Sequence, residues 1–153
     1  MEDLMLTPQQ KYPRRFTLCE AVLTARRTRV LVADDDPDVR RLLSLKLSKD
    51  GCDVVELEDG AHLHDYLASM ILGLSSDRPD IIVSDICMPG FSGLEVLEDL
   101  RRAKWTGPVV LMSAFDDEVA RMRAKQLGAK AVFHKPFDTD RLRALILDLS
   151  SGY

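Results

Sequence analysis

The sequence has few cysteines and no long hydrophobic run. Its 153 residues include three cysteines, Cys19, Cys52 and Cys87, which are far apart and form no C-x-x-C pair. This spacing excludes a disulfide framework and a C-x-x-C zinc site, and it is typical of a reducing cytosol. No apolar run approaches the roughly 18 residues that a membrane span needs. We therefore expect a cytoplasmic protein with no membrane span.

Positive charge is scarce outside the first 29 residues. The formal net charge is −4, but residues 1–29 hold 6 Lys/Arg against 3 Asp/Glu, and the remainder holds 15 against 22. The N-terminal part therefore carries +3 and the rest carries −7. An acidic body argues against a nucleic-acid surface. We expect no direct DNA binding by this chain.

Residues 1–28 form an extension whose role the sequence leaves open. The pair Arg14-Arg15 suggests a twin-arginine export signal, but the apolar stretch after it is short and contains Glu20, so we reject export. Thr17 and Glu20 instead form a capping box, which predicts a short helix over 17–27. A segment without a packing role is the alternative. The predicted helix has one apolar stripe, made of Phe16, Cys19, Val22 and Leu23.

From residue 29 onward, apolar strands alternate with amphipathic helices. Strands are predicted at 30–33, 53–57, 81–84, 109–112 and 131–133. Helices are predicted from Pro37, from Gly60 and after the cap Ser92, over about 116–127, and near the C-terminus. Continuous apolar strands are typical of a parallel sheet that is buried on both faces. The predicted fold is α/β, a doubly wound five-stranded parallel sheet with helices on both faces, over residues 29–150.

Two of the predicted helices have a clear apolar side. In the helix after Pro37 the expected inward residues are Val39, Leu42, Leu43 and Leu47. In the helix after Gly60 they are Leu63, Leu67, Met70, Ile71 and Leu74.

Five polar residues follow or end the predicted strands at one edge of the sheet. They are Asp34 and Asp35 after the first strand, Asp85 after the third, Ser113 after the fourth and Lys135 after the fifth. Ligands of such sheets bind at this carboxyl edge. Clustered carboxylates repel unless a cation lies among them, and Mg²⁺ prefers oxygen ligands.

These residue types suit transfer of a phosphoryl group. A carboxylate can attack phosphorus to form an aspartyl phosphate. Lys135 would supply positive charge and Ser113 a hydrogen bond to the transferred group. Because no ATP-binding loop is apparent, the phosphoryl donor must come from outside the chain.

The motifs VLVADDDP, IIVSDICMPGFSGLEVL, VVLMSA and VFHKPF occur in this order at the strand ends. Residues 29–149 thereby resemble the receiver domain of two-component response regulators (the flavodoxin-like receiver fold), including stand-alone chemotaxis-type regulators. The resemblance implies that Asp85 is the phosphoacceptor and that Ser113 and Lys135 assist it. It implies Mg²⁺ bound by Asp34, Asp35, Asp85 and the backbone carbonyl of Cys87, with Asp35 the more direct ligand than Asp34. It also implies a cis Lys135-Pro136 peptide.

The resemblance further implies partners. The phosphoryl donor would be a sensor histidine kinase or a histidine phosphotransfer protein, docking near Asp38, Arg40 and Arg41. The phosphorylated form would act on a downstream protein target. A homodimer could form through the fourth helix, fifth strand and fifth helix of the domain. Such a protein is a signalling phosphoacceptor rather than an enzyme, because it catalyses only its own phosphoryl transfer and dephosphorylation.

Some positions depart from the family or have simpler roles. Three residues before Lys135 the family commonly has Tyr or Phe, and this chain has Val132. Two positions that border the approach of hydrolytic water in the family are Cys87 and Phe115 here. Asp36 is expected to cap the following helix rather than to bind metal. The histidines His62 and His64 are expected to face solvent, and His134 to point away from the site.

Three other functions fit these residues less well. A haloacid-dehalogenase-like phosphatase would need a second Asp two residues after Asp85, where this chain has Cys87. A metal-dependent nuclease would leave Lys135 and Ser113 without a purpose. A receiver that signals by binding alone would not need all five polar residues.

Overall fold

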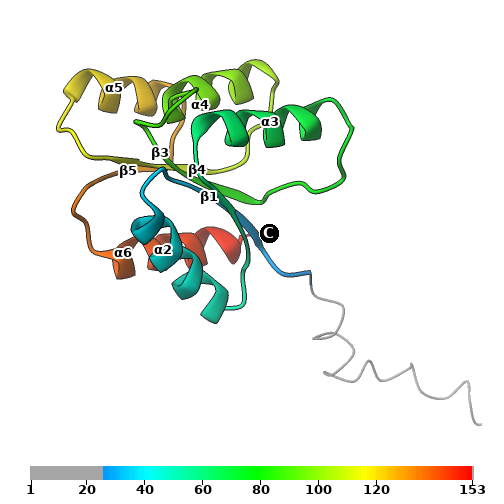
Figure 1. Ribbon diagram of the computed structural model, residues 1–153, viewed down its shortest axis with the longest axis horizontal. Coiled ribbons are helices and arrows are strands. Elements are labelled where there is room, and N and C mark those ends of the chain that lie inside the picture. The colour runs from blue at the N-terminus through cyan, green and yellow to red at the C-terminus, as the bar shows by residue number, and fades with distance from the viewer. Residues whose placement is uncertain (1–25, 153) are drawn as a thin grey trace, which may run out of the picture.

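Residues 26–152 of the chain are described by a computed structural model, in which five strands alternate with five helices (Figure 1). The strands are β1 (Arg29–Ala33), β2 (Asp53–Leu57), β3 (Ile81–Asp85), β4 (Val109–Ser113) and β5 (Ala131–His134). The helices are α2 (Pro37–Lys49), α3 (Gly60–Ile71), α4 (Gly93–Arg102), α5 (Glu118–Gln126) and α6 (Thr139–Ser150). All strand pairs are parallel, in the order β2-β1-β3-β4-β5. The predicted doubly wound fold is confirmed.

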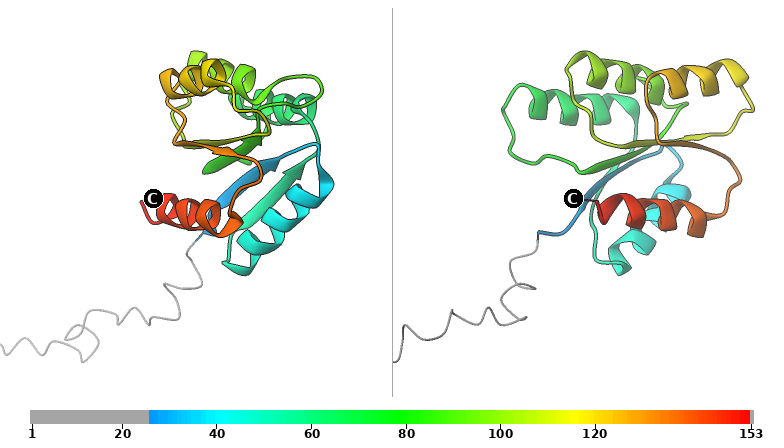
Figure 2. Two further views of the ribbon diagram at one scale, coloured as in Figure 1. Left: turned by 90° about the vertical axis from the view of Figure 1, so that its left-hand side faces the viewer. Right: turned by 180° about the vertical axis from the view of Figure 1, so that it is seen from behind.

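Helices cover both faces of the sheet. α2 and α6 lie on one face and α3, α4 and α5 on the other, which is clear in Figure 1 and in both views of Figure 2. The strand order reverses direction between β1 and β3, so the carboxyl ends of these two strands flank the switch point where α/β sheets bind ligands.

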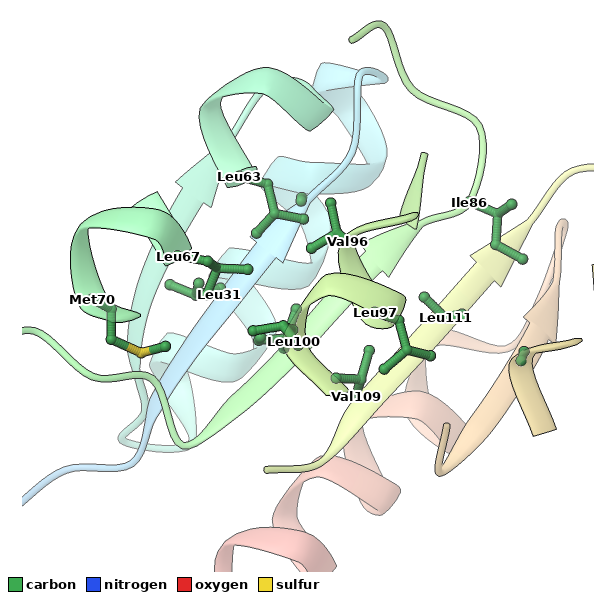
Figure 3. Packing of buried hydrophobic residues seen from close by; sticks show 13 residues of the cluster. Leu31, Leu63, Leu67, Met70, Ile86, Val96, Leu97, Leu100, Val109 and Leu111 are labelled. Atoms are coloured by element: carbon green, nitrogen blue, oxygen red, sulfur yellow. The ribbon is translucent and has the colours of Figure 1, made fainter. Parts of the chain in front are cut away.

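The core has two parts because alternate residues of each strand point to opposite faces. On the α3–α5 face, β1, β3 and β4 contribute Leu31, Ala33, Ile82, Val109 and Leu111, which pack against leucines of α3 and α4 (Figure 3). On the α2–α6 face they contribute Val30, Val32, Ile81, Val83, Val110 and Met112. The three central strands are almost fully buried, as their continuous apolar sequences predicted.

Each helix begins at a polar cap that the sequence supplies. The Asp36 carboxylate accepts a hydrogen bond from the Asp38 amide at 2.9 Å, and Pro37 occupies the first helical position. Ser92 and Glu95 form a complete capping box at the start of α4. The cap roles predicted for Asp36 and Ser92 are confirmed, and these caps orient the helices that leave the carboxyl edge of the sheet.

Three core predictions were wrong. Leu42 and Ile71 are exposed, since the buried stripes of α2 and α3 run through their neighbours Leu43 and Met70, about 100° away around each helix. Leu74 is 78% exposed because α3 ends at Ile71, before the helical pattern would bring it inward.

The predicted helix over 17–27 lies almost wholly outside the described residues. Its last two residues, Arg26 and Arg27, are not helical. Within 26–152, no helix is both long and apolar enough to cross a bilayer.

Candidate functional site

Three carboxylates meet at the carboxyl edge of the sheet. Asp34 and Asp35 follow β1, and Asp85 is the last residue of β3. One carboxylate oxygen from each lies within 4.8 Å of the others. Asp34 is 0% exposed and Asp85 is 4% exposed, whereas Asp35 is exposed to solvent. The convergence predicted from the strand ends is therefore present for these three residues.

Lys135 connects two of the carboxylates. Its Nζ donates to Asp34 Oδ2 at 2.7 Å and to Asp85 Oδ2 at 3.0 Å. The Lys135 backbone amide donates to the carbonyl of Ser113 at 2.7 Å, and the Lys135-Pro136 peptide is cis, as predicted. The lysine side chain is 18% exposed, so its ammonium group acts in a partly desolvated site.

Burial and pairing act differently on the two ionisable partners. Burial raises the pKa of Asp85, and this effect exceeds the opposing hydrogen bond from Lys135. Burial alone would lower the pKa of Lys135, but its hydrogen bonds to Asp34 and Asp85 outweigh burial, so its pKa is raised. The lysine therefore stays charged, while the ionised form of Asp85 is held at a cost in free energy.

The carboxylate cluster fits a hard divalent cation. Asp34 Oδ1 accepts from the Asp36 amide at 2.9 Å and Asp85 Oδ1 accepts from the Cys87 amide at 3.2 Å, so both side chains are held in place. Within residues 26–152 the Asp35 carboxylate accepts no hydrogen bond. Three carboxylates beside one lysine leave excess negative charge at this site. The side-chain atoms that could bind a metal here are carboxylate oxygens, the ligands that Mg²⁺ prefers.

Ser113 is at the same edge but its hydroxyl does not reach Asp85. Ser113 Oγ donates to the Phe115 carbonyl at 2.8 Å and accepts from the Phe115 amide at 3.2 Å. Phe115 is 66% exposed, so its ring does not cover the site. Val132, Ser113, Phe115 and the exposed His134 line a small hollow beside α5. Within residues 26–152 the His134 ring forms no hydrogen bond or ion pair with the three carboxylates.

The loop after β3 is fastened to the start of α3. The Gly60 amide donates to the Pro89 carbonyl at 3.0 Å, and the Phe91 ring stacks on His64 with centroids 4.1 Å apart. The prediction that His64 faces solvent was thus wrong, because the H-x-H pattern carries no information about a partner from a distant loop. His62 is exposed, as predicted, and lies 2.7 Å from Asp59.

Two further contacts at the site were not apparent from the sequence. Arg40 Nη1 donates to the Asp34 carbonyl at 2.6 Å, which fixes the backbone below the acidic cluster. A Cβ atom on Gly93 would lie 2.4 Å from the Asp85 carbonyl oxygen, so only glycine permits α4 to begin this close to β3. In the sequence, the close approach of Gly93 to Asp85 was indicated only by the position of this glycine in the motif IIVSDICMPGFSGLEVL.

Comparison with known proteins identifies the family. The sequence pattern of the response regulator receiver domain matches residues 30–147. The chain belongs to the response regulator receiver domain family. This match confirms the resemblance inferred from the four motifs. Receivers are signalling phosphoacceptors of two-component systems.

Curated relatives contain this receiver as one part of a longer protein. The chain is 36% identical over 124 residues to the DNA-binding transcriptional regulator NtrC of Escherichia coli K12, covering 81% of this chain and 25% of NtrC. It is 30% identical over 118 residues to the alkaline phosphatase synthesis transcriptional regulatory protein PhoP of Bacillus subtilis, covering 77% of this chain and 46% of PhoP. The chain thus spans between a quarter and a half of these relatives.

Solved receivers share the fold. The receiver domain of the Francisella response regulator 1452 superposes with a TM-score of 0.71 at 27% identity, covering 81% of this chain and 97% of that one. The response regulator TrrA of Thermotoga maritima, solved in complex with Mg²⁺ and BeF, gives 0.66 at 29% identity, covering 80% and 98%.

Proposed function

We propose that this receiver accepts a phosphoryl group on Asp85 from a histidine kinase or a histidine phosphotransfer protein, using Mg²⁺, and thereby changes its partner-binding surface. Residues 29–150 would be the receiver and residues 1–28 an extension. The proposal rests mainly on the position of Lys135. Its Nζ atom lies 2.7 Å from Asp34 Oδ2 and 3.0 Å from Asp85 Oδ2. The separated cysteines favour a cytoplasmic location.

The geometry supports in-line transfer to Asp85. An oxygen of its carboxylate forms the new bond to phosphorus as the bond from phosphorus to the donor's histidine nitrogen breaks. The Cys87 amide keeps the carboxylate oriented. Asp34 keeps hold of Lys135 Nζ, so the lysine remains available to the phosphoryl oxygens when the charge on Asp85 is consumed by bond formation.

Mg²⁺, when bound, would offset the negative charge that collects on the transferred oxygens. Asp34, Asp35, Asp85 and the backbone carbonyl of Cys87 would hold it. The excess of carboxylates over lysine at this edge supports that ligand set.

Ser113 supplies the link from phosphorylation to a change of surface. To donate to a phosphoryl oxygen on Asp85, its hydroxyl must leave the Phe115 carbonyl, which would loosen the turn before α5. Val132 leaves no aromatic ring to move inward with it. We therefore infer that the output of this receiver depends on the turn before α5 and on the α5, β5 and α6 face, read by a protein target or a second copy rather than by DNA.

The direct test is incubation with a small phosphodonor and Mg²⁺ followed by intact-mass analysis. We expect an acid-stable gain of one phosphoryl group, located on the peptide that contains Asp85. A phosphatase would instead release phosphate continuously, and a receiver that only binds partners would show neither result. Either of those results would contradict the proposal.

Mg²⁺ should stabilise the folded protein, and Asp35→Ala should remove the effect. A ligand that binds only the folded state adds about 2.7 kcal/mol at a concentration 100 times its dissociation constant. Thermal unfolding across a millimolar Mg²⁺ series measures this. Asp148→Ala, which removes an exposed carboxylate of α6, is the matched control and should keep the response. A wild-type melting temperature that does not change across the Mg²⁺ series would argue against the metal site.

The phosphoryl group should be lost faster from the double variant Cys87→Asn/Phe115→Glu. Neither native side chain can hold the attacking water by a strong hydrogen bond, whereas the substituted amide and carboxylate can. Orienting such a group contributes on the order of 10²-fold in general acid–base catalysis, and a gain of about tenfold is expected here. The measurement is the rate at which the phosphorylated wild type and the phosphorylated double variant lose the phosphoryl group after the donor is removed. Equal lifetimes would mean that hydrolysis is set elsewhere.

A further inference from the structure

An apolar groove lies between α3 and α4, on the face of the sheet opposite α2. Its volume is about 230 Å³, and its lining residues include His64, Leu67, Ala68, Leu72, Val96 and Leu100. At one end, Ile71 and Leu72 are exposed by 44% and 70%, and Leu74 follows in the adjacent loop. Large exposed apolar side chains that gather at one place usually mark a surface covered by another segment or protein.

This end of the groove is where the chain enters the domain. Ile71 also lines a second hollow, of about 540 Å³, together with Arg26 and Trp105. Arg26 is anchored there, since its Nη2 lies 2.6 Å from Asp80 Oδ1, and the Arg29 amide donates to the same carboxylate at 2.7 Å. Arg26, the first described residue, therefore lies close to the end of the groove at Ile71.

We propose that residues 16–23 of this chain occupy the groove between α3 and α4. Their apolar residues recur at helical spacing and would form one stripe: Phe16, Cys19, Val22 and Leu23. Eight helical residues span about 12 Å, and the groove follows α3 for about 10 Å from Ile71 to His64. Thr24 and Ala25 add a link of up to about 7 Å between this segment and Arg26.

The attachment point sets the direction of the segment. Leu23 would lie beside Ile71 and Leu72, and Phe16 would lie beside His64 at the far end. Arg14 and Arg15, which precede Phe16 in the sequence, would then lie near two acidic residues at the His64 end of the groove. There, Asp65 and Asp99 lie 3.9 Å and 3.8 Å from the His64 ring nitrogens. The charges are complementary, and the apolar contacts supply most of the binding free energy because exposed ion pairs contribute little.

The tether favours this segment over a second copy. A binding segment joined by a short linker acts at an effective concentration in the millimolar range, far above the micromolar concentration of free protein in a typical measurement. His64 both lines the groove and stacks on Phe91, so the segment would contact the residue that packs on the loop after Asp85. This contact would form whether or not Asp85 accepts a phosphoryl group.

Disulfide trapping tests the proposal, because Cys19 lies in the middle of the segment and Ala68 in the middle of the groove. In a Cys87→Ser background, Ala68→Cys is treated with oxidised glutathione and the products are analysed by non-reducing mass spectrometry. We expect an intrachain disulfide between positions 19 and 68. It should be absent in Cys19→Ser, and it should form at least about tenfold more slowly with Leu23→Asp, whose charge cannot be buried without a large free-energy cost.

Ser48→Cys in the same background is the matched control. Ser48 is exposed in the last turn of α2, five residues before Asp53, whose amide donates to the Thr28 carbonyl at 2.9 Å. Unlike Ala68, it is on the α2 face of the sheet. A segment that binds the groove reacts at least about tenfold faster at position 68 than at 48. Equal rates at the two positions, or no disulfide at 68, would overturn the proposal. A disulfide between two chains would assign the groove to a second copy and would overturn it as well.

Discussion

Asp85→Asn should reduce phosphoryl uptake at least about a thousandfold, since loss of a catalytic nucleophile typically has effects of this size or larger. The amide keeps the shape of the carboxylate but cannot attack phosphorus. Mass spectrometry of the protein after treatment with a phosphodonor and Mg²⁺ measures the uptake. Asp36→Asn is the matched control, because asparagine caps helices as well as aspartate does and Asp36 lies outside the cluster of three carboxylates. Uptake by Asp85→Asn at the wild-type rate would show that another residue is the acceptor.

The same variant should be more stable than the wild type at neutral pH without Mg²⁺. Burial raises the folded-state pKa of Asp85 above its unfolded value. A group with a raised pKa contributes stability that is complete below the unfolded pKa and is lost as pH rises through the folded pKa. The asparagine side chain does not titrate and avoids this loss. The stability difference should therefore vanish below about pH 4, the ordinary range of an aspartate, and grow above it. A difference that does not change with pH would contradict this explanation.

Gly60→Ala should lower the unfolding free energy by about 3 kcal/mol, the upper end of the usual cost of overpacking. A Cβ atom at this position would lie 1.7 Å from the Phe91 carbonyl oxygen, and the obstacle is backbone rather than a movable side chain. Either α3 or the loop after β3 must shift, and the hydrogen bond from Gly60 to Pro89 would be lost. The melting temperature should fall by about 10 °C for a domain of this size.

Gly152→Ala is the matched control for Gly60→Ala. Its added Cβ would meet only the Leu149 carbonyl at 3.7 Å, an ordinary contact, so the melting temperature should stay within about 1 °C of wild type. If Gly60→Ala is equally well tolerated, then the loop after β3 is not held against α3 in the way its contacts indicate.

Most of the architecture followed from local sequence features. Continuous apolar strands, capping residues such as Asp36 and Ser92, and strand ends rich in polar residues predicted the sheet, the helices and the edge where Asp34, Asp35, Asp85 and Lys135 meet. These features are local because strand burial and helix capping depend on residues within one turn or one strand of each other. The parallel topology then brings the strand ends together without further information.

Only the tertiary structure decided how side chains from distant elements pair. Lys135 bridges Asp34 and Asp85, and His64 stacks on Phe91. The exposure of Ile71 beside the chain entry was also not predictable from the sequence, because Ile71 fits the apolar pattern of α3. Such contacts join residues far apart in sequence, and hydrophobic periodicity reports which face of a helix is apolar but not which neighbour covers it.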